Sequence, residues 1–532
     1  MSTELSDIAK ASARGSFFLF LGNTSSTTIM ALASILIARL LGPENYGLYS
    51  LAMIAPSLLT ALSDIGISPA LTMFSARFHS EGKNWKVVGL IKAGIIFKSI
   101  FSLLLSIVLL LLSESIATWV LKRPGLVLLI RFTSLYLVGQ GLVKTLESIF
   151  IGLDKTENSA LLMNIQAITK AVTSPLLIIL GMGAIGAILG AGLGFLLAAG
   201  MGVTILLLGI RPRLYGRNHG ENVDFFQGLR LMIPYGMPLY LSTLTATLFA
   251  QYQCFILAFF ASNMEIGNYT IAMNFSAMIT LLFYPIAISL FPAFSKLNIE
   301  ENRDKVQKMF KLSVKYTSLL VIPASFAVAV LSKEAVYTLY GFQYGFAPSY
   351  LALYVLSFLY TGLGMGVMGS LFNGQGDTKT TLRIDIINLS LSMPLTFVFT
   401  FLYGVPGLVT SFLISQFLST TYGLFLVYKK YAVMVDWASS LRTGVASLSS
   451  TLLTHLFLTL VPLSNPVYKL AAGGLLYIMS FLIFAPLTGA VNISDIVNLR
   501  EILSELGPLT PLFNIPLNLV EKTLMYLQSR PK

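Results

Sequence analysis

Long apolar runs separated by short polar breaks are the feature that most limits the folds open to this 532-residue chain. A hydrocarbon core about 30 Å thick needs about 20 apolar residues per helix, and many runs of that length follow one another here. Hydrophobic residues make up 55% of the chain, charged residues only 11%, and the mean hydropathy is +0.79. The period-two alternation of a membrane barrel is absent. The sequence therefore predicts an all-α polytopic membrane protein with about 14 transmembrane helices.

The first two runs are joined by a short segment, Arg39 to Tyr49, with the sequence Arg-Leu-Leu-Gly-Pro-Glu-Asn-Tyr-Gly-Leu-Tyr. Pro43 lacks an amide hydrogen and disfavours helix at Gly42, which predicts a tight outer hairpin. Together with Leu62-Ser-Asp-Ile-Gly66, this segment resembles the opening of the polysaccharide-transporter (Wzx-type) flippases of the multidrug/oligosaccharidyl-lipid/polysaccharide (MOP) exporter superfamily. The resemblance is densest over residues 14–80. It implies two six-helix lobes around a central cavity, two further C-terminal helices, and a lipid-linked glycan as substrate.

An internal repeat with an offset of about 220 residues supports two equivalent lobes. Four segments recur in the same order: Gly47–Met53 as Gly267–Met273, Ser148–Gly152 as Ser370–Gly374, Pro175 as Pro394, and Gly183–Gly186 as Gly404–Gly407. Because each copy holds six spans, both copies enter from the same side and should be related by an axis along the membrane normal. Such lobes can rock about a central site, which predicts alternating access.

The predicted organisation follows from the repeat and the loop positions. It comprises an N-terminal six-helix lobe (14–210), a cytoplasmic linker (211–227), a C-terminal six-helix lobe (228–428), two additional transmembrane helices (440–490) and an amphipathic cytoplasmic tail (493–532). The tail is predicted to lie on the inner membrane face.

Basic residues predict the orientation of the chain in the membrane. Of the 35 Lys and Arg residues, five fall in outer loops, four fall within spans, and the other 26 fall on the side taken as inner; the outer five are Arg39, Lys122, Arg123, Lys333 and Lys469. This bias predicts a multi-pass protein of the cytoplasmic membrane with both termini in the cytoplasm. Topology therefore explains the net charge of +12 better than nucleic-acid binding does.

Ionisable groups inside the spans are the candidate substrate-binding residues, because each costs about 2.5–3.5 kcal/mol at a helix centre. Lys98 and Lys170 lie about 16–20 Å above the inner boundary, too deep for their side chains to reach an interface easily. The predicted solution is a water-filled cavity in which both lysines, with Arg131, hold the diphosphate of the substrate. Snorkelling to an interface is the alternative, above all for Arg131. Asp64, in the Asp-Ile-Gly-Ile-Ser-Pro interruption of the second span, either caps that break or lines the cavity.

Two further polar groups have competing interpretations. Asp385 and Asn388 share one helix face, and Thr410 and Ser411 of the next helix could approach them, which suits a sodium ion or a proton relay. The alternative for Asp385 is a helix-start carboxylate beside Arg383. Lys144 lies one turn from Glu147, so a structural ion pair is favoured there.

No enzyme motif is present, and no segment outside the spans is long enough for a catalytic domain. The three histidines lack a second ligand at metal spacing, and the single Cys254 excludes intrachain disulfides. The sequence thus predicts a flippase for a lipid-linked oligosaccharide or polysaccharide precursor, functional as a monomer among membrane lipids, with no metal or cofactor beyond coupling to a Na⁺ or H⁺ gradient. The alternatives are a multidrug or lipid exporter of the same superfamily, and a polytopic glycosyltransferase or polymerase, which is disfavoured because a large outer catalytic loop is missing.

Overall fold

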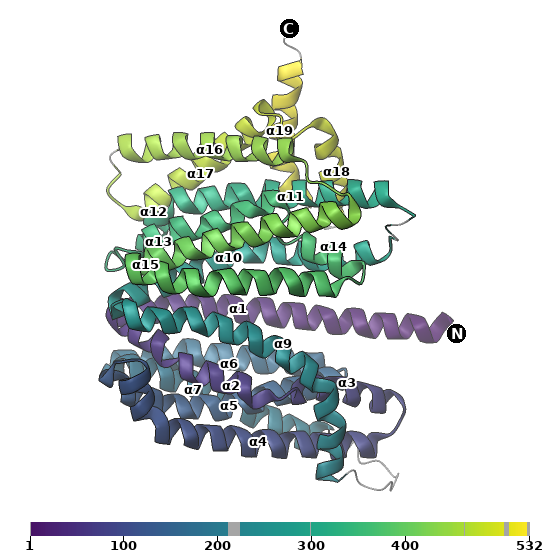
Figure 1. Cartoon of the computed structure of the whole chain (residues 1–532), viewed down its shortest axis with the longest axis vertical. Helices are drawn as coiled ribbons and strands as arrows, with labels where there is room; N and C mark the ends of the chain where they lie inside the picture. Colours follow the sequence, from purple (N-terminus) through teal and green to yellow (C-terminus); the bar gives the residue numbers. More distant parts are fainter. Residues whose placement is uncertain are drawn as a thin grey trace. The chain divides into compact units, whose positions relative to one another are not determined.

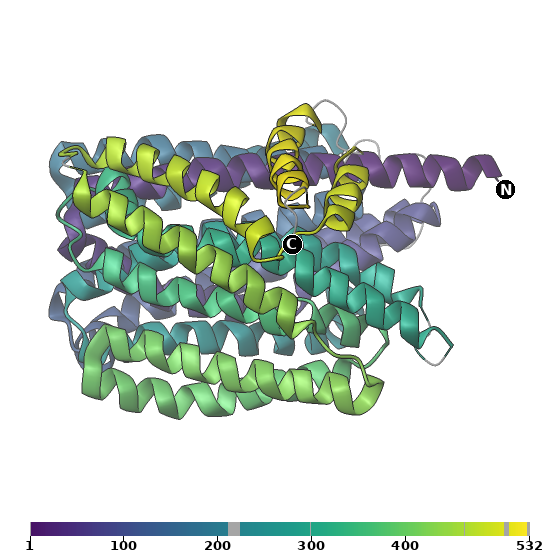
Figure 2. The same cartoon turned by 90° about the horizontal axis from the view of Figure 1, so that it is seen from above.

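The computed structural model describes residues 2–210, 224–297, 299, 301–461, 463–504 and 510–528, and all regular elements within them are helical. Most of the predicted linker (211–227) lies outside these residues. The chain divides into two compact units, Met1–Gly267 and Asn268–Lys532. Within each unit the helices run side by side as a bundle (Figures 1 and 2).

Unit 1 contains the helices of the first predicted lobe and the first helix of the second. They are α1 (Ser2–Ala52), α2 (Ile54–Asp64), α3 (Ile67–Ser80), α4 (Asn84–Ser115), η1 (Ile116–Val120), η2 (Pro124–Leu126), α5 (Val127–Gly152), α6 (Thr156–Leu177), η3 (Ile178–Met182), α7 (Gly183–Thr204), η4 (Ile205–Ile210) and α9 (Phe225–Phe260). Its packing centres on α5, α6 and α7, with α1 against α6 and α4 against α5.

Unit 2 holds the remaining helices, and α10 begins at the end of unit 1. They are α10 (Asn263–Ser295), α11 (Arg303–Val330), α12 (Ser332–Leu339), α13 (Ala347–Tyr354), η5 (Val355–Leu363), α14 (Met368–Gly374), α15 (Thr378–Tyr431), α16 (Trp437–Leu460), α17 (Pro466–Leu487), α18 (Ile493–Ser504) and α19 (Thr510–Gln528). The pair α16 and α17, which corresponds to the two predicted extra helices, packs together and against α11 and α12 respectively.

Sharp breaks divide several long helices into pairs of spans. Among the described residues, eight helices are long and apolar enough to cross a membrane, or nine when the bent pair Ala347–Leu363 and Met368–Gly374 counts as one. Three of them are 47, 55 and 54 residues long, too long for a single crossing. The first of these contains Gly42 in a non-helical conformation, where the hairpin is predicted. The described helices are consistent with fourteen spans, a count that stays a prediction.

The internal repeat is visible in backbone conformation as well as in sequence. Gly183 (φ 52°, ψ −135°) and its counterpart Gly404 (φ 62°, ψ −141°) adopt nearly the same left-handed conformation at the turn between two spans. Residues with a Cβ rarely adopt a positive φ, so glycine recurs there. Gly152 and its counterpart Gly374 are each the last residue of a helix. The predicted repeat is therefore confirmed at these positions.

The boundary between the units differs from the boundary between the repeats. Helix α9 packs on α2, α3 and α4, so by contact it belongs to unit 1, although by repeat it opens the second lobe. This arrangement depends on close backbone approach. A Cβ on Gly66 would lie 2.2 Å from the carbonyl carbon of Gly236 in α9, which only two glycines allow.

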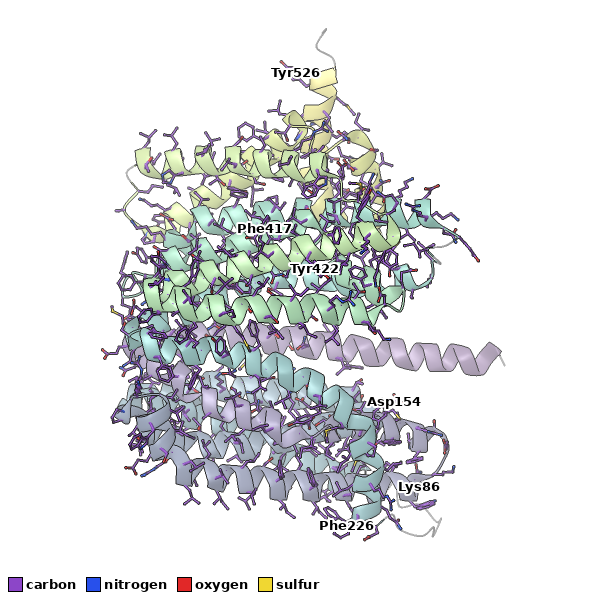
Figure 3. All side chains as sticks on the ribbon, in the orientation of Figure 1. Lys86, Asp154, Phe226, Phe417, Tyr422 and Tyr526 are labelled. Atoms are coloured by element: carbon purple, nitrogen blue, oxygen red, sulfur yellow. The ribbon has the colours of Figure 1, made fainter. Side chains whose placement is uncertain are left out.

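Apolar side chains cover the outside of both bundles, as expected for helices surrounded by lipid. Figure 3 shows side chains projecting from the helix surfaces, among them the exposed Phe226 of α9 and Phe417 of α15. Small residues instead mark the helix contacts. A Cβ on Gly190 of α7 would lie 2.3 Å from the hydroxyl of Ser174 in α6. The glycine-rich run of α7 is thus a close packing surface, as its spacing predicts.

The C-terminal tail packs on the other helices of unit 2 through both apolar and polar contacts. Helices α18 and α19 contact each other, and α19 packs on α17. The buried Asp495 of α18 pairs with Lys315 of α11 at 2.6 Å, and Asn498 donates to the Tyr316 hydroxyl at 3.0 Å. The predicted amphipathic tail is helical over both described segments; residues 505–509 and 529–532 lie outside the described part.

Candidate functional site

A break between α2 and α3 positions the polar centre of unit 1. Helix α2 ends at Asp64, and the next two residues, Ile65 (φ 43°) and Gly66 (φ 78°), have left-handed conformations before α3 begins at Ile67. The Asp-Ile-Gly-Ile-Ser-Pro interruption is therefore confirmed as a helix break. It frees backbone groups inside a span and directs Asp64 toward the neighbouring helices.

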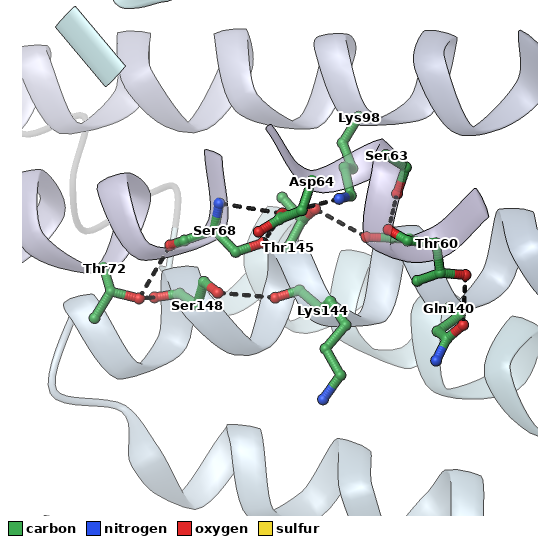
Figure 4. Close-up of polar contacts among 11 residues, drawn as sticks. Thr60, Ser63, Asp64, Ser68, Thr72, Lys98, Gln140, Lys144, Thr145 and Ser148 are labelled. Carbon is green, nitrogen blue, oxygen red and sulfur yellow. Dashed lines mark hydrogen bonds and ion pairs between the residues drawn. The ribbon is translucent and has the colours of Figure 1, made fainter. Parts of the chain in front are cut away.

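Asp64 contacts residues on both sides of the break, one in α3 and one in α4. Its Oδ1 atom accepts hydrogen bonds from the Ser68 hydroxyl at 2.5 Å and the Ser68 amide at 3.4 Å, which secures the first turn of α3. The same atom accepts from Lys98 Nζ of α4 at 2.9 Å. Figure 4 shows the two charged side chains pointing toward each other across the break. Asp64 is thus the counter-charge of Lys98.

The surroundings of Lys98 differ from the prediction. We expected a lysine kept charged by cavity water, whereas Lys98 is only 1% exposed and ion-paired. The sequence argument counted acidic groups only within the third to fifth spans, and the partner comes from the second. Because the break turns Asp64 toward α4, a residue outside that range reaches the lysine. In this structure the cation is neutralised by the protein.

Further polar contacts surround the pair and were missing from the sequence prediction. The Thr60 hydroxyl donates to Gln140 Oε1 of α5 at 2.7 Å, and the Thr72 hydroxyl donates to the carbonyl of Ser148 at 3.1 Å (Figure 4). Gln140 places an amide in the middle of an apolar span, and this feature of the sequence could have identified it as part of a polar site. The predicted Lys144–Glu147 ion pair of α5 is confirmed at 2.9 Å.

Lys170 and Arg131 lie apart from this pair. Lys170 is half-buried on α6 beside the backbone of Gly194, and within the described part of the chain it has no hydrogen-bond or ion-pair partner. Helix α6 packs mainly on α1 and α7, whereas α4 packs on α5 and α9. Arg131 is exposed and donates from Nε to the Ser113 hydroxyl at 3.2 Å. The structure brings Lys98 together with Asp64, and not with Lys170.

Unit 2 contains a separate small cavity of about 140 Å³. Its polar lining includes Asp385 and Asn388 from the first half of α15 and Gln416, Ser419 and Thr420 from the second half. Asn388 Nδ2 donates to Gln416 Oε1 at 3.4 Å, while Asn388 Oδ1 is buried and has no partner among the described residues. Carboxylate, amide and hydroxyl oxygens together suit a hard cation or an ordered water.

Thr410 and Ser411 do not approach Asp385 and Asn388, so that part of the prediction is wrong. Thr410 donates to the carbonyl of Pro406, and Ser411 lies 3.0 Å from the hydroxyl of Thr396. The two halves of α15 are antiparallel about Gly404. A residue a given number of positions before Gly404 therefore faces a residue a similar number of positions after it. Asp385 and Asn388 lie far before Gly404, so they face the stretch from Gln416 to Thr420.

No cluster of three or more His, Cys, Asp or Glu residues suited to a metal ion occurs in the part of the chain that the structure describes. The first site holds a neutralised ion pair, and the second is lined by oxygens of the kind that coordinate a small cation. Both lie in helices predicted to cross the membrane.

Comparisons with sequence families match the chain in two overlapping parts. Residues 12–298 match the family described as Polysaccharide biosynthesis protein, which is more than half of the chain. Residues 237–479 match the family described as Lipid II flippase MurJ. The first match covers the first repeat and the start of the second, and the second match covers most of the second repeat and of the two additional helices.

Two curated proteins show more distant similarity. An uncharacterized membrane protein in the cps region of Klebsiella pneumoniae is 22% identical over 470 residues, covering 86% of this chain and 93% of that protein. The probable low-salt glycan biosynthesis flippase Agl15 of Haloferax volcanii is 20% identical over 268 residues, covering 49% of this chain and 56% of that protein. The chain thus spans little more than half the length of the Haloferax protein.

A solved structure of the lipid II flippase MurJ, in an inward closed conformation, resembles this chain in fold. The TM-score is 0.69 and the identity 16%, and the match covers 88% of this chain and 98% of the MurJ chain. At this identity the likeness concerns the fold alone.

Proposed function

The chain belongs to the polysaccharide biosynthesis protein family, and from this premise we infer that it is a flippase for a lipid-linked oligosaccharide or polysaccharide precursor. It moves this substrate from the inner to the outer leaflet by alternating access. The observation that carries the inference is that a single chain matches a polysaccharide biosynthesis family over its first repeat and the start of its second, and a flippase family over most of its second. The resemblance seen in the segment from Arg39 to Tyr49 is thereby confirmed at the level of the family.

The alternative functions are less well supported. A multidrug exporter would not be expected to match a polysaccharide biosynthesis family. The two additional helices α16 and α17 are also what the resemblance to the Wzx-type flippases implies. A glycosyltransferase or polymerase is disfavoured because the families that match contain transporters. The protein is therefore a transporter rather than an enzyme.

The proposed substrate site consists of Lys170 with Arg131, joined by Lys98 when it is released from Asp64. Lys170 supports this assignment because it is a half-buried cation without a protein partner among the described residues, and such a charge needs an anion or water. A diphosphate would supply the counter-charge through charge-assisted hydrogen bonds. Arg131 is exposed, and Ser113 is its one hydrogen-bond partner among the described residues, so its guanidinium group could contribute a second set of donors.

The proposed coupling site is the cavity of unit 2, revised by the observed register. Asp385 and Asn388 remain its first two ligands, and Gln416, Ser419 and Thr420 replace Thr410 and Ser411. A Na⁺ ion or a proton bound there would couple transport to an ion gradient. Asp385→Asn is expected to remove the dependence of transport on that gradient, with Thr410→Val as the matched control that retains it. Unchanged gradient dependence in Asp385→Asn would assign Asp385 to the start of its helix instead.

We place the protein in the cytoplasmic membrane as a monomer with both termini inside. This orientation is testable in a background where Cys254, the single cysteine, is replaced by Ala. A cysteine at Asn302 is expected to be shielded from an impermeant thiol reagent in intact cells, because it lies in a basic and therefore inner loop. A cysteine at Asn465 should react. Labelling of the first and protection of the second would invert the topology.

The function itself is tested in liposomes containing the purified protein. The probe is a polyprenyl-diphosphate disaccharide with a fluorescent label, and the measurement is its transfer between leaflets, followed by an impermeant quencher. We expect transfer without any change in the mass of the lipid. Lys170→Gln should slow transfer by roughly tenfold to a hundredfold, the worth of one charged hydrogen bond of about 1.5–3 kcal/mol. Lys155→Gln, at the start of the same helix, is the control; equal rates in both variants would remove Lys170 from the substrate site.

A further inference from the structure

The described hydrogen bonds to Asp64 all end on one of its two carboxylate oxygens. All three donors of the pair, the Ser68 hydroxyl, the Ser68 amide and Lys98 Nζ, bind to Asp64 Oδ1. Asp64 Oδ2 has no hydrogen bond within the described residues. The side chain of Asp64 is 30% exposed, against 2% for Lys98. The carboxylate is therefore the member of the pair that a proton can reach, and the free oxygen is the atom on which it would bind.

Among the described residues, no anion other than Asp64 is in position to pair with the ammonium group of Lys98. Helix α5 contributes Lys144 and Glu147, which pair with each other at 2.9 Å, and α9 contributes Tyr240, whose hydroxyl lies within the electrostatic influence of Asp64. The basic residues of α3, Arg77 and His79, lie in its last turn, at the opposite end of that helix from the break and Asp64. Among the described groups that face the pair, Asp64 alone neutralises Lys98.

The stem of Lys98 is enclosed by small residues. Gly141 of α5 borders it, because a Cβ on that glycine would lie 3.7 Å from Lys98 Cε and 2.3 Å from the Ser102 hydroxyl. The Ser102 hydroxyl is buried and has no partner in the described part of the chain. One polar group without a partner among the described residues thus lies beside the lysine, and the missing Cβ of Gly141 lets α5 pack closely on this part of α4.

We propose that Asp64 is a proton-binding site that controls whether Lys98 is available to the anionic head of the substrate, a proposal that rests on the proposed flippase function. A proton from water binds Oδ2 and makes the carboxyl group neutral. Lys98 remains an ammonium ion, so the net charge of the pair rises from zero to plus one. The diphosphate then replaces Asp64 as the partner of Nζ. When the anion leaves, Asp64 releases the proton and the ion pair forms again.

The coupling between proton and anion follows from the cost of an unpaired charge. A lone ammonium ion inside a membrane helix costs about 2.5–3.5 kcal/mol on insertion scales, so protonation without an anion is disfavoured. An anion beside the deprotonated carboxylate meets a like charge and is disfavoured as well. Each ligand therefore promotes binding of the other, and linkage requires the two effects to be equal.

The test measures binding of geranyl diphosphate, a soluble prenyl diphosphate, to the purified full chain by calorimetry. We expect wild type to bind about tenfold or more weakly than Asp64→Asn at pH 8, because the carboxylate competes for Lys98, and we expect this difference to shrink as the pH is lowered to 5. Titration of the probe itself cancels in this ratio. Asn retains an acceptor for Ser68, so loss of the helix cap does not explain the change. Equal affinities of the two proteins at both pH values would overturn the proposal.

A second variant covers the case in which Asp64→Asn leaves a buried lysine unpaired and does not fold. Asp64→Asn/Lys98→Gln removes both charges, and such replacements are tolerated better than removal of one partner. Calorimetry in buffers of different ionisation enthalpy counts the protons taken up with the probe near pH 7. Wild type should take up more protons per diphosphate than the double variant, by up to one. No excess uptake would refute the proton site.

The two proposals fail in different ways. If the wild-type protein moves the labelled lipid between leaflets but shows no excess proton uptake, the proton site is wrong and the flippase function stands. If wild type moves no lipid, the flippase function falls, whatever the soluble probe shows.

Discussion

The contact between Gly47 and Gly267 offers the sharpest test of how the repeats are packed in unit 1. A Cβ on Gly47 would lie 1.9 Å from the carbonyl oxygen of Asn263, and a Cβ on Gly267 would lie 2.0 Å from the carbonyl oxygen of Pro43. Each glycine thus meets the carbonyl four residues before its counterpart in the repeat. Two equivalent contacts of this kind hold the start of α10 against the second half of α1.

We expect Gly47→Ala to destabilise the protein. A normal carbon–oxygen contact is about 3.2 Å, so the two backbones must separate by more than about 1 Å, and overpacking of this kind costs roughly 1–3 kcal/mol. Alanine in an open helix position is worth up to about 1 kcal/mol more than glycine. Gly200 of α7 and Gly444 of α16 are the matched controls, because nothing lies within 4 Å of a Cβ built there.

The assay is thermal unfolding of the purified variants in detergent. Gly47→Ala should be less stable than Gly200→Ala and Gly444→Ala by about 1–3 kcal/mol, the cost of the clash, because alanine gains the same helix preference at all three positions; this is a few degrees in Tm for a chain of this length. Gly47→Ala/Gly267→Ala should lose less than the sum of its single variants, because one separation relieves both clashes. If Gly47→Ala has the same Tm as the control variants, the close contact does not exist in solution.

Two other contacts give further predictions. Lys315→Met should leave the buried Asp495 without its cationic partner, with only the Asn492 amide still donating to it among the described residues, and should cost about 3–5 kcal/mol and expose the tail to limited proteolysis. Lys315→Met/Asp495→Leu should recover much of that loss; intact tails in the single variant would argue against the docking. At the start of α15, burial alone would raise the pKa of Asp377, but hydrogen bonds from Lys430 and Thr380 outweigh it and hold the pKa below its usual range. The stabilisation is therefore present above the pKa of the unfolded group, about 3.9, and is lost as the pH falls through the lower folded value. Wild type should exceed Asp377→Asn in Tm by a constant amount between pH 7 and 5, with the difference shrinking below about pH 4; a difference that is independent of pH down to pH 3 would contradict this account.

The sequence by itself determined every feature that depends on neighbours along the chain. The apolar runs require helices because a backbone surrounded by lipid must satisfy its own hydrogen bonds. The breaks at Gly42 and after Asp64 follow from local rules for proline and glycine, and the repeat follows from recurring glycines such as Gly183 and Gly404. The Lys144–Glu147 pair was accessible in the same way, since its members lie one helical turn apart.

The tertiary structure decided which residues meet across helices. Asp64 rather than water neutralises Lys98, because the break in one helix turns the carboxylate toward another. Gln416 rather than Thr410 faces Asn388, because the position of the turn at Gly404 sets the antiparallel register. Each residue along a helix rotates its side chain by about 100°, so a small change in how two helices pack selects a different pair of partners. Helix packing is set by close contacts such as that of Gly66 with Gly236, between residues far apart in the sequence. No local pattern contains that information.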